Sequence, residues 1–256
     1  MLYGICNLSI VPLRLTTTDS SEMVSQVLFG EHFKILEEEK NWSKISLHLD
    51  NQEGYIDNKQ YLKITESEYL KLSETPPCFS GELINFITHT NQQLTTIPIG
   101  STLPFYNGKQ FHINNTAYTY EGKIFSKKLP KTKLINIAFS FLNTPFLLGG
   151  KTPFGIDNSG FTQLVYQLCG YRLHRKTEAQ ATQGEVLSFI EESEPGDLAF
   201  FDNEEGVITH VGMIMNDYNI IHAYGKVRID TLDHSGIYNV DTQKHTHKLR
   251  VIKRIV

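Results

Sequence analysis

Short apolar runs separated by turn residues fill the first quarter of the chain. They lie at residues 8–13, 23–29, 33–36, 42–49 and 54–57. Runs of this length, interrupted every few residues by Gly, Asn, Asp or Ser, are typical of the strands of a small barrel. The pattern therefore predicts a small β-barrel over residues 1–65.

A charged and then proline-bearing stretch, 66–77, follows and is interpreted as a linker. Beyond it, residues 78–130 again alternate between short β-type runs and turn signals. The clearest of these signals is Asn107-Gly108, a dipeptide that favours the tight turns of β-hairpins. We expect it to join strands at 103–106 and 110–113, and we interpret the region as a second small β domain.

The third region, 131–256, has a different pattern. Helical spacing of apolar residues marks 134–142 and 159–168, and Thr177-Glu178-Ala179-Gln180 has the form of a capping box for a third helix that runs to about Ile190. After Pro195-Gly196-Asp197 the pattern is that of strands, at 198–201, 210–215, 220–223, 227–229 and 249–256. Helices that precede strands in this way favour an α+β domain.

Composition and charge narrow the possible partners. The net charge is −4 with a pI near 6.2, which lacks the basic footprint of a nucleic-acid-binding protein. No apolar run approaches the roughly 20 residues of a membrane span, and the first residues do not have the pattern of a secretory signal. Three widely spaced cysteines, Cys6, Cys78 and Cys169, favour reduced, mostly buried thiols. We therefore expect a cytoplasmic protein that binds neither nucleic acid nor membrane.

Four motifs in the third region carry a family resemblance. They lie at 143–161 (NTPFLLGGKTPFGIDNSGF), 195–201 (PGDLAFF), 209–214 (THVGMI) and 221–223 (IHA). In this order and spacing they strongly resemble the NlpC-type murein peptidases, whose signature reads roughly T-P-Y-x-W-G-G and then G-x-D-C-S-G-F. The resemblance implies a papain-like α+β domain. It also implies that the two preceding β regions are the paired bacterial SH3-like domains of murein-peptide-recycling γ-D-glutamyl-L-diamino acid endopeptidases.

The resemblance also implies which residues form the site. Peptidases of this kind need a thiolate at a helix N-terminus, where the helix dipole lowers the thiol pKa. A histidine on a facing strand pairs with the thiol, and a third polar group orients that histidine. By resemblance His210 is the base and His222 its partner, on antiparallel strands joined through Asn216-Asp217.

The residue at the nucleophile position is asparagine, Asn158. An amide forms no thiolate and is neither an acid nor a base. Asparagine is a good N-cap, which predicts that Asn158 closes the helix structurally. Ser159 is no substitute, because one helical step turns its side chain by about 100° away from His210. Cys169 is excluded because it lies about 16 Å further along the helix axis.

Other departures from the family pattern fall around the same cleft. Phe146 replaces the signature tyrosine, whose hydroxyl is implied to polarise the scissile carbonyl, and Leu148 replaces the tryptophan. Tyr224 occupies a usually small position after His222 and is expected to crowd the cleft. Loss of one donor to the developing oxyanion typically costs about 10² to 10³ in rate.

A charge reversal is expected where the ligand's amino terminus would lie. Arg175-Lys176-Thr177 stands where the recycling members read R-D-S, and that aspartate is implied to hold the free amine of the substrate's L-alanine. Lys176 would repel an ammonium group. Thr177, together with Asp157 and Ser159 of the signature, completes the predicted binding residues.

The sequence therefore predicts a three-part protein with two small SH3-like β-barrels and a papain-like α+β domain. Since Asn158 stands at the nucleophile position, the leading hypothesis is an inactive homologue that binds a murein-derived peptide or a protein in a modified cleft. One alternative is an active peptidase on cell-wall peptides whose nucleophile has been replaced. Another is an interaction module that uses its SH3-like domains. No metal or cofactor is implied, because no Cys/His cluster has ligand spacing; the oligomeric state is not encoded in any motif.

Overall fold

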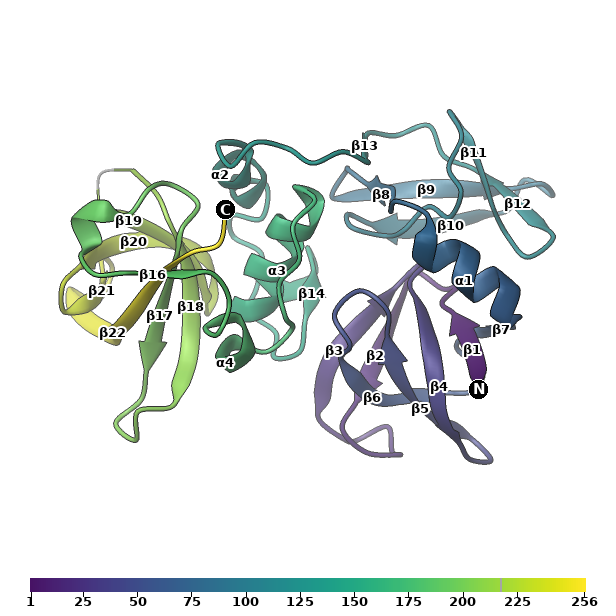
Figure 1. The fold of residues 1–256 in the computed structure, drawn as a ribbon, viewed down its shortest axis with the longest axis horizontal. Helices are drawn as coiled ribbons and strands as arrows, with labels where there is room; N and C mark the ends of the chain where they lie inside the picture. Colours follow the sequence, from purple (N-terminus) through teal and green to yellow (C-terminus); the bar gives the residue numbers. More distant parts are fainter. Residues whose placement is uncertain (217) are drawn as a thin grey trace. The chain divides into compact units, whose positions relative to one another are not determined.

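The computed structural model describes residues 1–216 and 218–256, which divide into two compact units, Met1–Lys127 and Lys128–Val256 (Figure 1). Each unit is described by itself. None of the helices in these described residues has the length and apolar character needed to cross a bilayer.

The first unit begins with an antiparallel sheet whose strands match the predicted runs. In chain order the strands are β1 (Leu2–Ile5), β2 (Ile10–Arg14), β3 (Met23–Leu28), β4 (His32–Glu38), β5 (Trp42–Leu47), β6 (Glu53–Asp57) and β7 (Leu62–Ile64), and they pair in the order β3-β2-β6-β5-β4-β1-β7. Alternation explains the burial, since Ser43, Ile45 and Leu47 of β5 face inward while the residues between them are partly exposed. The two strands that sequence reasoning missed, β1 and β7, pair with each other.

The predicted linker contains a helix, α1 (Glu66–Glu74). Thr65 caps it by accepting a hydrogen bond from the backbone N–H of Glu68. Tyr69 and Leu72 are spaced one helical turn apart and are buried, and the Tyr69 ring stacks on Tyr3 of β1 with centroids 4.3 Å apart. Residues 66–74 are therefore part of the packed core of this unit rather than an open connection.

The second β region forms a smaller sheet that shares a core with the first. Its strands are β8 (Phe79–Ser80), β9 (Ile84–His89), β10 (Leu94–Pro98), β11 (Gln110–Ile113), β12 (Thr116–Thr119) and β13 (Ile124–Phe125), which pair as β10-β9-β12-β11 and β13-β8. Phe29, just after β3, contacts the rings of Phe111 and Tyr118 edge-on at 5.9 and 5.7 Å. One cluster of buried side chains thus joins residues from both β regions.

The hairpin predicted at Asn107-Gly108 is wrong. The dipeptide does make a tight turn, with the N–H of Asn107 donating to the carbonyl of Gln110 at 2.8 Å, but no strand precedes it. Pro104 has no N–H to offer a ladder, and Phe105 has a left-handed φ of 56°. The hairpin forms instead between β11 and β12, across the turn at 114–115.

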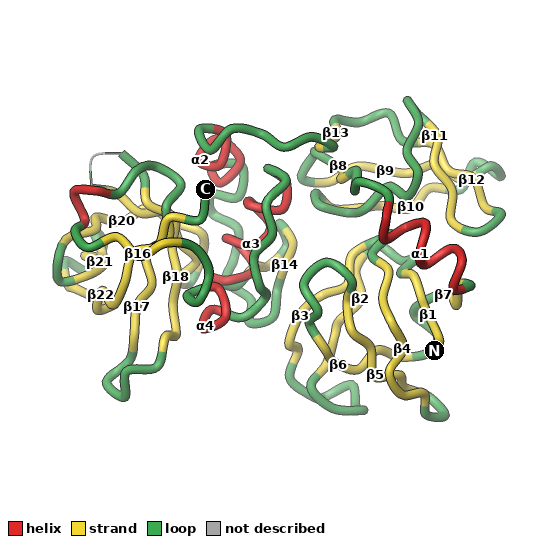
Figure 2. The backbone as a smooth tube through the Cα atoms, in the orientation of Figure 1, coloured by secondary structure: helices red, strands yellow, loops and turns green. Residues whose placement is uncertain are grey.

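The second unit places helices before a closed β-barrel (Figures 1 and 2). The helices are α2 (Lys133–Phe139), α3 (Asn158–Leu168) and α4 (Thr177–Gln180); β14 (Lys151–Thr152) and β15 (Gly155–Ile156) form a short pair before α3. The barrel strands are β17 (Leu198–Asp202), β18 (Ile208–Ile214), β19 (Asn219–Tyr224), β20 (Lys226–Asp233), β21 (Gly236–Asn239) and β22 (Lys244–Arg254). Pairing of β22 with both β17 and β21 closes the ring, and α3 packs on β18 and β19.

The third predicted helix is far shorter than expected. It ends at Gln180 instead of near Ile190, and β16 (Glu185–Leu187) follows and pairs with β22; a 3₁₀ turn, η1, spans Ile190–Glu192. Gly184 ends the turn after the helix with a left-handed φ of 70°. The capping box also fails, because Lys176 holds the N-cap position and makes no side-chain cap bond. Pairing with β22 has overridden the local helical pattern.

A buried histidine, His32, in the first unit predicts a pH-dependent stability. His32 stacks on His48 with ring centroids 4.5 Å apart, and its Nε2 lies 3.1 Å from the hydroxyl of Ser73 on α1. Burial, with a smaller contribution from His48, lowers the pKa of His32 to about 3. Because the unfolded chain then binds a proton that the folded chain does not, stability falls as the pH drops from about 6.5 towards 3.

We expect the unfolding free energy of this unit to fall by up to about 1.4 kcal/mol per pH unit between pH 6 and 4 through His32. Urea titrations followed by fluorescence of the single tryptophan, Trp42 of β5, measure it. His32→Gln should flatten this slope, whereas the matched change at the exposed His112 should not. Equal slopes for His32→Gln and the unchanged protein would contradict the assignment.

Candidate functional site

The site is built at the N-terminus of α3, and the N-cap there is Asp157 rather than Asn158. The Asp157 carboxylate accepts from the backbone N–H of Gly160 at 2.6 Å, and Asn158 is the first helical residue. The prediction that Asn158 caps the helix is therefore wrong. Because the cap is already supplied, the Asn158 side chain is free to project from the helix end.

A buried ion pair fixes that helix end. Arg175 donates to the two oxygens of Asp157 at 2.9 and 2.8 Å, in the paired geometry that gives guanidinium–carboxylate bonds their strength. The same carboxylate accepts from the N–H of Gly149 at 2.8 Å, and Arg175 also reaches the hydroxyl of Ser159 at 3.0 Å. Ser159 thus faces the ion pair and is buried there, which leaves it no role beside His210.

The amide of Asn158 has hydrogen-bond partners on both sides. Its nitrogen lies 3.1 Å from Nδ1 of His210 and 3.3 Å from the carbonyl of Thr209. Its oxygen accepts from the hydroxyl of Thr177 at 3.0 Å. The amide therefore bridges β18 and α4 at the position that the family resemblance gives to a thiol.

The two predicted histidines, on the neighbouring strands β18 and β19, are in contact. Nε2 of His210 is 2.8 Å from Nδ1 of His222, and the strands pair antiparallel with Gly212 opposite His222. Both side chains are buried. Of the predicted connection between their strands, Asn216 is described and Asp217 lies outside the described residues.

Two charged residues that sequence reasoning missed continue the chain of contacts. Nε2 of His222 lies 3.0 Å from Oδ2 of Asp230, and Arg228 donates to the two oxygens of Asp230 at 2.7 and 2.8 Å. Asp230 is only 1% exposed. A signal was present in the sequence: Arg228 and Asp230 are two residues apart in a run next to that of His222, so both face one side of the sheet.

The electrostatics of the site favour neutral imidazoles. Burial lowers the pKa of His210 well below its ordinary value, and neighbouring His222 and His247 lower it further. Burial also lowers the pKa of His222, against the opposing effect of Asp230. Burial alone would raise the pKa of Asp230, but its hydrogen bonds to His222, Arg228 and a backbone N–H outweigh this and bring it to about 2.

A third histidine, His247 of β22, was not predicted. Its ring stacks on that of His210 with centroids 4.0 Å apart, and burial lowers its pKa to about 4. Tyr224 meets the same ring edge-on at 4.9 Å and is 47% exposed, so it stands at the mouth of the site. Tyr224 is thus in contact with His247, and its crowding of a cleft stays a prediction.

The remaining predicted residues lie at exposed positions. Phe146 is 39% exposed, and its backbone N–H donates to the carbonyl of Gly225 beside Tyr224. Leu148 is 58% exposed, and Lys176 is exposed at the start of α4. Phe146 and Lys176 thus present an apolar and a cationic side chain to solvent.

Among residues 1–216 and 218–256 no metal site is found, and none of the three cysteines is an accessible thiol. Within these described residues, no group of three or more His, Cys, Asp and Glu side chains is arranged to hold a metal ion. All three cysteines are buried free thiols, as expected, and burial raises their pKa values to about 12 for Cys6 and about 11 for Cys78 and Cys169. Cys169 ends α3 at its far terminus from Asn158.

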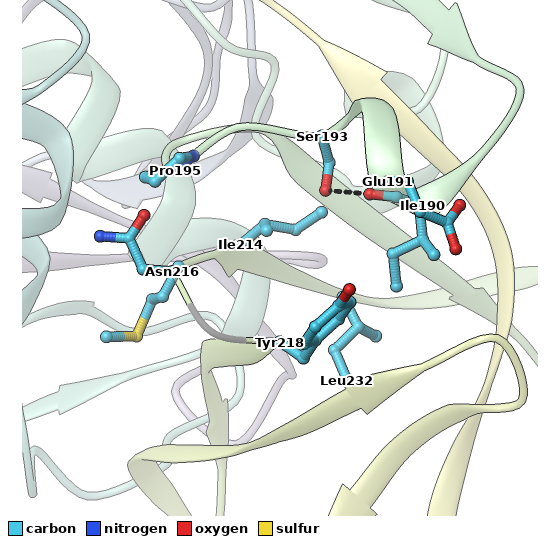
Figure 3. Close-up of a pocket in the computed structure, with 9 residues that line it drawn as sticks. Ile190, Glu191, Ser193, Pro195, Ile214, Asn216, Tyr218 and Leu232 are labelled. Atoms are coloured by element: carbon cyan, nitrogen blue, oxygen red, sulfur yellow. Dashed lines mark hydrogen bonds between the residues drawn. The ribbon is translucent and has the colours of Figure 1, made fainter.

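A separate hollow of about 270 Å³ lies elsewhere on the barrel (Figure 3). Its apolar lining includes Ile190, Ile214 and Leu232, with Glu191 and Asn216 among the polar residues. Ile214 is the last residue of β18, whereas His210 lies near the start of that strand, and none of the predicted site residues lines the hollow. The hollow is therefore separate from the hydrogen-bonded residues at the N-terminus of α3.

Both units of the chain contain a segment that matches a known family. The profile of the NlpC/P60 family matches residues 143–248, and that of the bacterial dipeptidyl-peptidase SH3 domain matches residues 13–60. The chain is 25% identical over 235 residues to the γ-D-glutamyl-L-lysine dipeptidyl-peptidase of Bacillus cereus (82% of this chain, 70% of the relative). It is 26% identical over 229 residues to the enzyme of the same name from Bacillus subtilis (82% and 75%).

A solved structure is similar over nearly the whole chain. An NlpC/P60 family protein from Bacillus cereus superposes with a TM-score of 0.82 at 18% identity and covers 99% of each chain. At this level of identity the likeness is one of fold.

Proposed function

Since this chain combines an NlpC/P60 domain with a bacterial SH3 domain and is homologous to the γ-D-glutamyl-L-lysine dipeptidyl-peptidases, we propose that it is a non-hydrolysing member that binds a peptidoglycan-derived peptide. The observation that carries the proposal is the amide of Asn158, which stands beside His210 where a thiol would be needed.

Two properties of Asn158 support the absence of hydrolysis. An amide nitrogen donates its lone pair to its own carbonyl, so it does not attack a peptide carbon and is not activated by a base. The amide is also held by Thr177, Thr209 and His210, which directs the lone pair of His210 into a hydrogen bond. Among residues 1–216 and 218–256, the side chains hydrogen-bonded to His210 are those of Asn158 and His222, and neither is a nucleophile of the kind a peptidase needs.

The scaffold around this position supports retained binding. The ion pair of Asp157 with Arg175 and the contact of His210 with His222 are intact and buried. Breaking a buried ion pair on one side typically costs about 3–5 kcal/mol, so the pair of Asp157 with Arg175 holds the end of α3 in place. We also propose that residues 78–130 are a second SH3-like domain, which their small antiparallel sheet supports.

The proposal is tested by calorimetry with L-Ala-γ-D-Glu-L-Lys and its N-acetylated form. Lys176 stands where the resemblance implies an aspartate, and an ammonium about 4 Å away would meet a repulsion of about 1 kcal/mol in water. We therefore expect the acetylated peptide to bind about fivefold more tightly than the free amine, as 1.4 kcal/mol corresponds to about tenfold. Lys176→Ala should remove the preference.

The matched control is Lys133→Ala, at another exposed lysine of the same unit, which should keep the preference. Absence of binding heat for both peptides would contradict a peptide-binding function. Tighter binding of the free amine, unchanged by Lys176→Ala, would contradict a reversed-charge subsite and leave binding itself supported.

A further inference from the structure

We infer that Asp230, held by Arg228, is a positioning residue that sets the tautomers of both buried histidines. Through them, and together with the carbonyl of Thr209, it orients the Asn158 amide. The inference deepens the proposed function, since it concerns the polarity that a ligand meets at the nucleophile position. It rests on an unbroken series of hydrogen bonds from Arg228 through Asp230, His222 and His210 to Asn158.

The Asp230 carboxylate only accepts hydrogen bonds, and this fixes the direction of the series. Both oxygens of Asp230 receive donors: Arg228 Nε at 2.7 Å and His222 Nε2 at 3.0 Å reach Oδ2, while Arg228 Nη2 at 2.8 Å and the N–H of Val240 at 3.1 Å reach Oδ1. An ionised carboxylate has no proton to give. Nε2 of His222 must therefore carry the hydrogen of that contact.

Each neutral imidazole ring then fixes the direction of the next hydrogen bond in the series. A neutral imidazole has one N–H and one lone pair, so the Nε2–H form of His222 leaves its Nδ1 as an acceptor. His210 must donate to it from Nε2 across 2.8 Å, which leaves Nδ1 of His210 as an acceptor in turn. Only the NH₂ end of Asn158 satisfies that acceptor, and its oxygen is then left to accept from Thr177.

Asparagine at position 230 should reverse this direction. In one orientation the amide oxygen takes the place of Oδ1 and accepts from Arg228 Nη2 and the N–H of Val240. The NH₂ group then faces His222, and one pair of donors, the NH₂ group and Arg228 Nε, is left in contact. The opposite orientation places the NH₂ group against two donors, Arg228 Nη2 and the N–H of Val240. The first orientation is favoured, and it requires an unprotonated Nε2 on His222. The same substitution behind a catalytic histidine in serine proteases leaves the geometry intact and produces the wrong tautomer.

Nitrogen-15 spectroscopy of the full chain without peptide reads the tautomers directly, because protonated and unprotonated ring nitrogens resonate far apart. Near neutral pH we expect His210 and His222 to be Nε2–H tautomers, and both to change to Nδ1–H in Asp230→Asn. The matched control is Asp233→Asn, on the same strand, whose carboxylate contacts the exposed His245 at 2.8 Å; it should leave both rings unchanged.

Two results would overturn the inference. One is an Nδ1–H tautomer at either His210 or His222 in the unchanged protein, a measurement that needs no variant to fold. The other is retention of both Nε2–H tautomers in folded Asp230→Asn. Since no peptide is present, failure here is distinguishable from failure of peptide binding in the calorimetry.

Discussion

Asn158→Cys by itself is expected to give a hydrolytic rate at least about 10²-fold below that of the Bacillus cereus relative, because a donor corresponding to the signature tyrosine is still missing at Phe146. A second obstacle is His210. Burial lowers its pKa well below the ordinary value, so the imidazolium that would stabilise an introduced thiolate is disfavoured at neutral pH. Thiol alkylation rates against pH should accordingly show a mostly protonated thiol.

Restoring the cleft together with the thiol should have a much larger effect. Adding Phe146→Tyr, Lys176→Asp and Tyr224→Ser to Asn158→Cys is expected to raise kcat/KM for L-Ala-γ-D-Glu-L-Lys by about 10² or more over the single variant. The gain should exceed the product of the separate gains, because residues that act as a unit are not additive.

The control for the rescue carries the three cleft substitutions with Asn158 retained, and it should remain inactive. The contrary outcome is an Asn158→Cys variant within about tenfold, or 1.4 kcal/mol, of the relative. That result would mean that the cleft is already suited to catalysis and that only the nucleophile is missing.

Most of the fold follows from periodicity that reports burial. The alternation in β5 and the helical spacing in α3 predict both elements to within a few residues, because each buries one regular face. The errors occur where tertiary pairing decides. Residues 185–187 pair with β22 instead of extending α4. Residues 66–74 form the helix α1, because Tyr69 and Leu72 are buried in the core of the first unit.

The candidate site was only partly predictable for a similar reason. Motif spacing indicates Asn158, His210 and His222, which the structure brings together through contacts of 3.1 and 2.8 Å. The cap at Asp157 was missed because two adjacent residues, Asp and Asn, both favour capping, and the sequence does not show which of them accepts from the N–H of Gly160.

The groups behind the histidines depend on strand register. β19 and β20 pair with His222 directly opposite Arg228, and this register brings Asp230, two residues further along β20, within reach of His222. His247 reaches His210 from β22, a strand that is distant in sequence and closes the barrel. The contact of His247 follows from the closure of the sheet and has no local sequence pattern.

The central claim, that this chain does not hydrolyse the peptides its relatives are named for, is tested most directly by mass spectrometry of L-Ala-γ-D-Glu-L-Lys after prolonged incubation with the unmodified protein. We expect no more product than with heat-inactivated protein, since the amide of Asn158 is not a nucleophile and His210 has no thiol to activate. His210→Ala should behave identically. Product above the heat-inactivated control that disappears in His210→Ala would contradict the account.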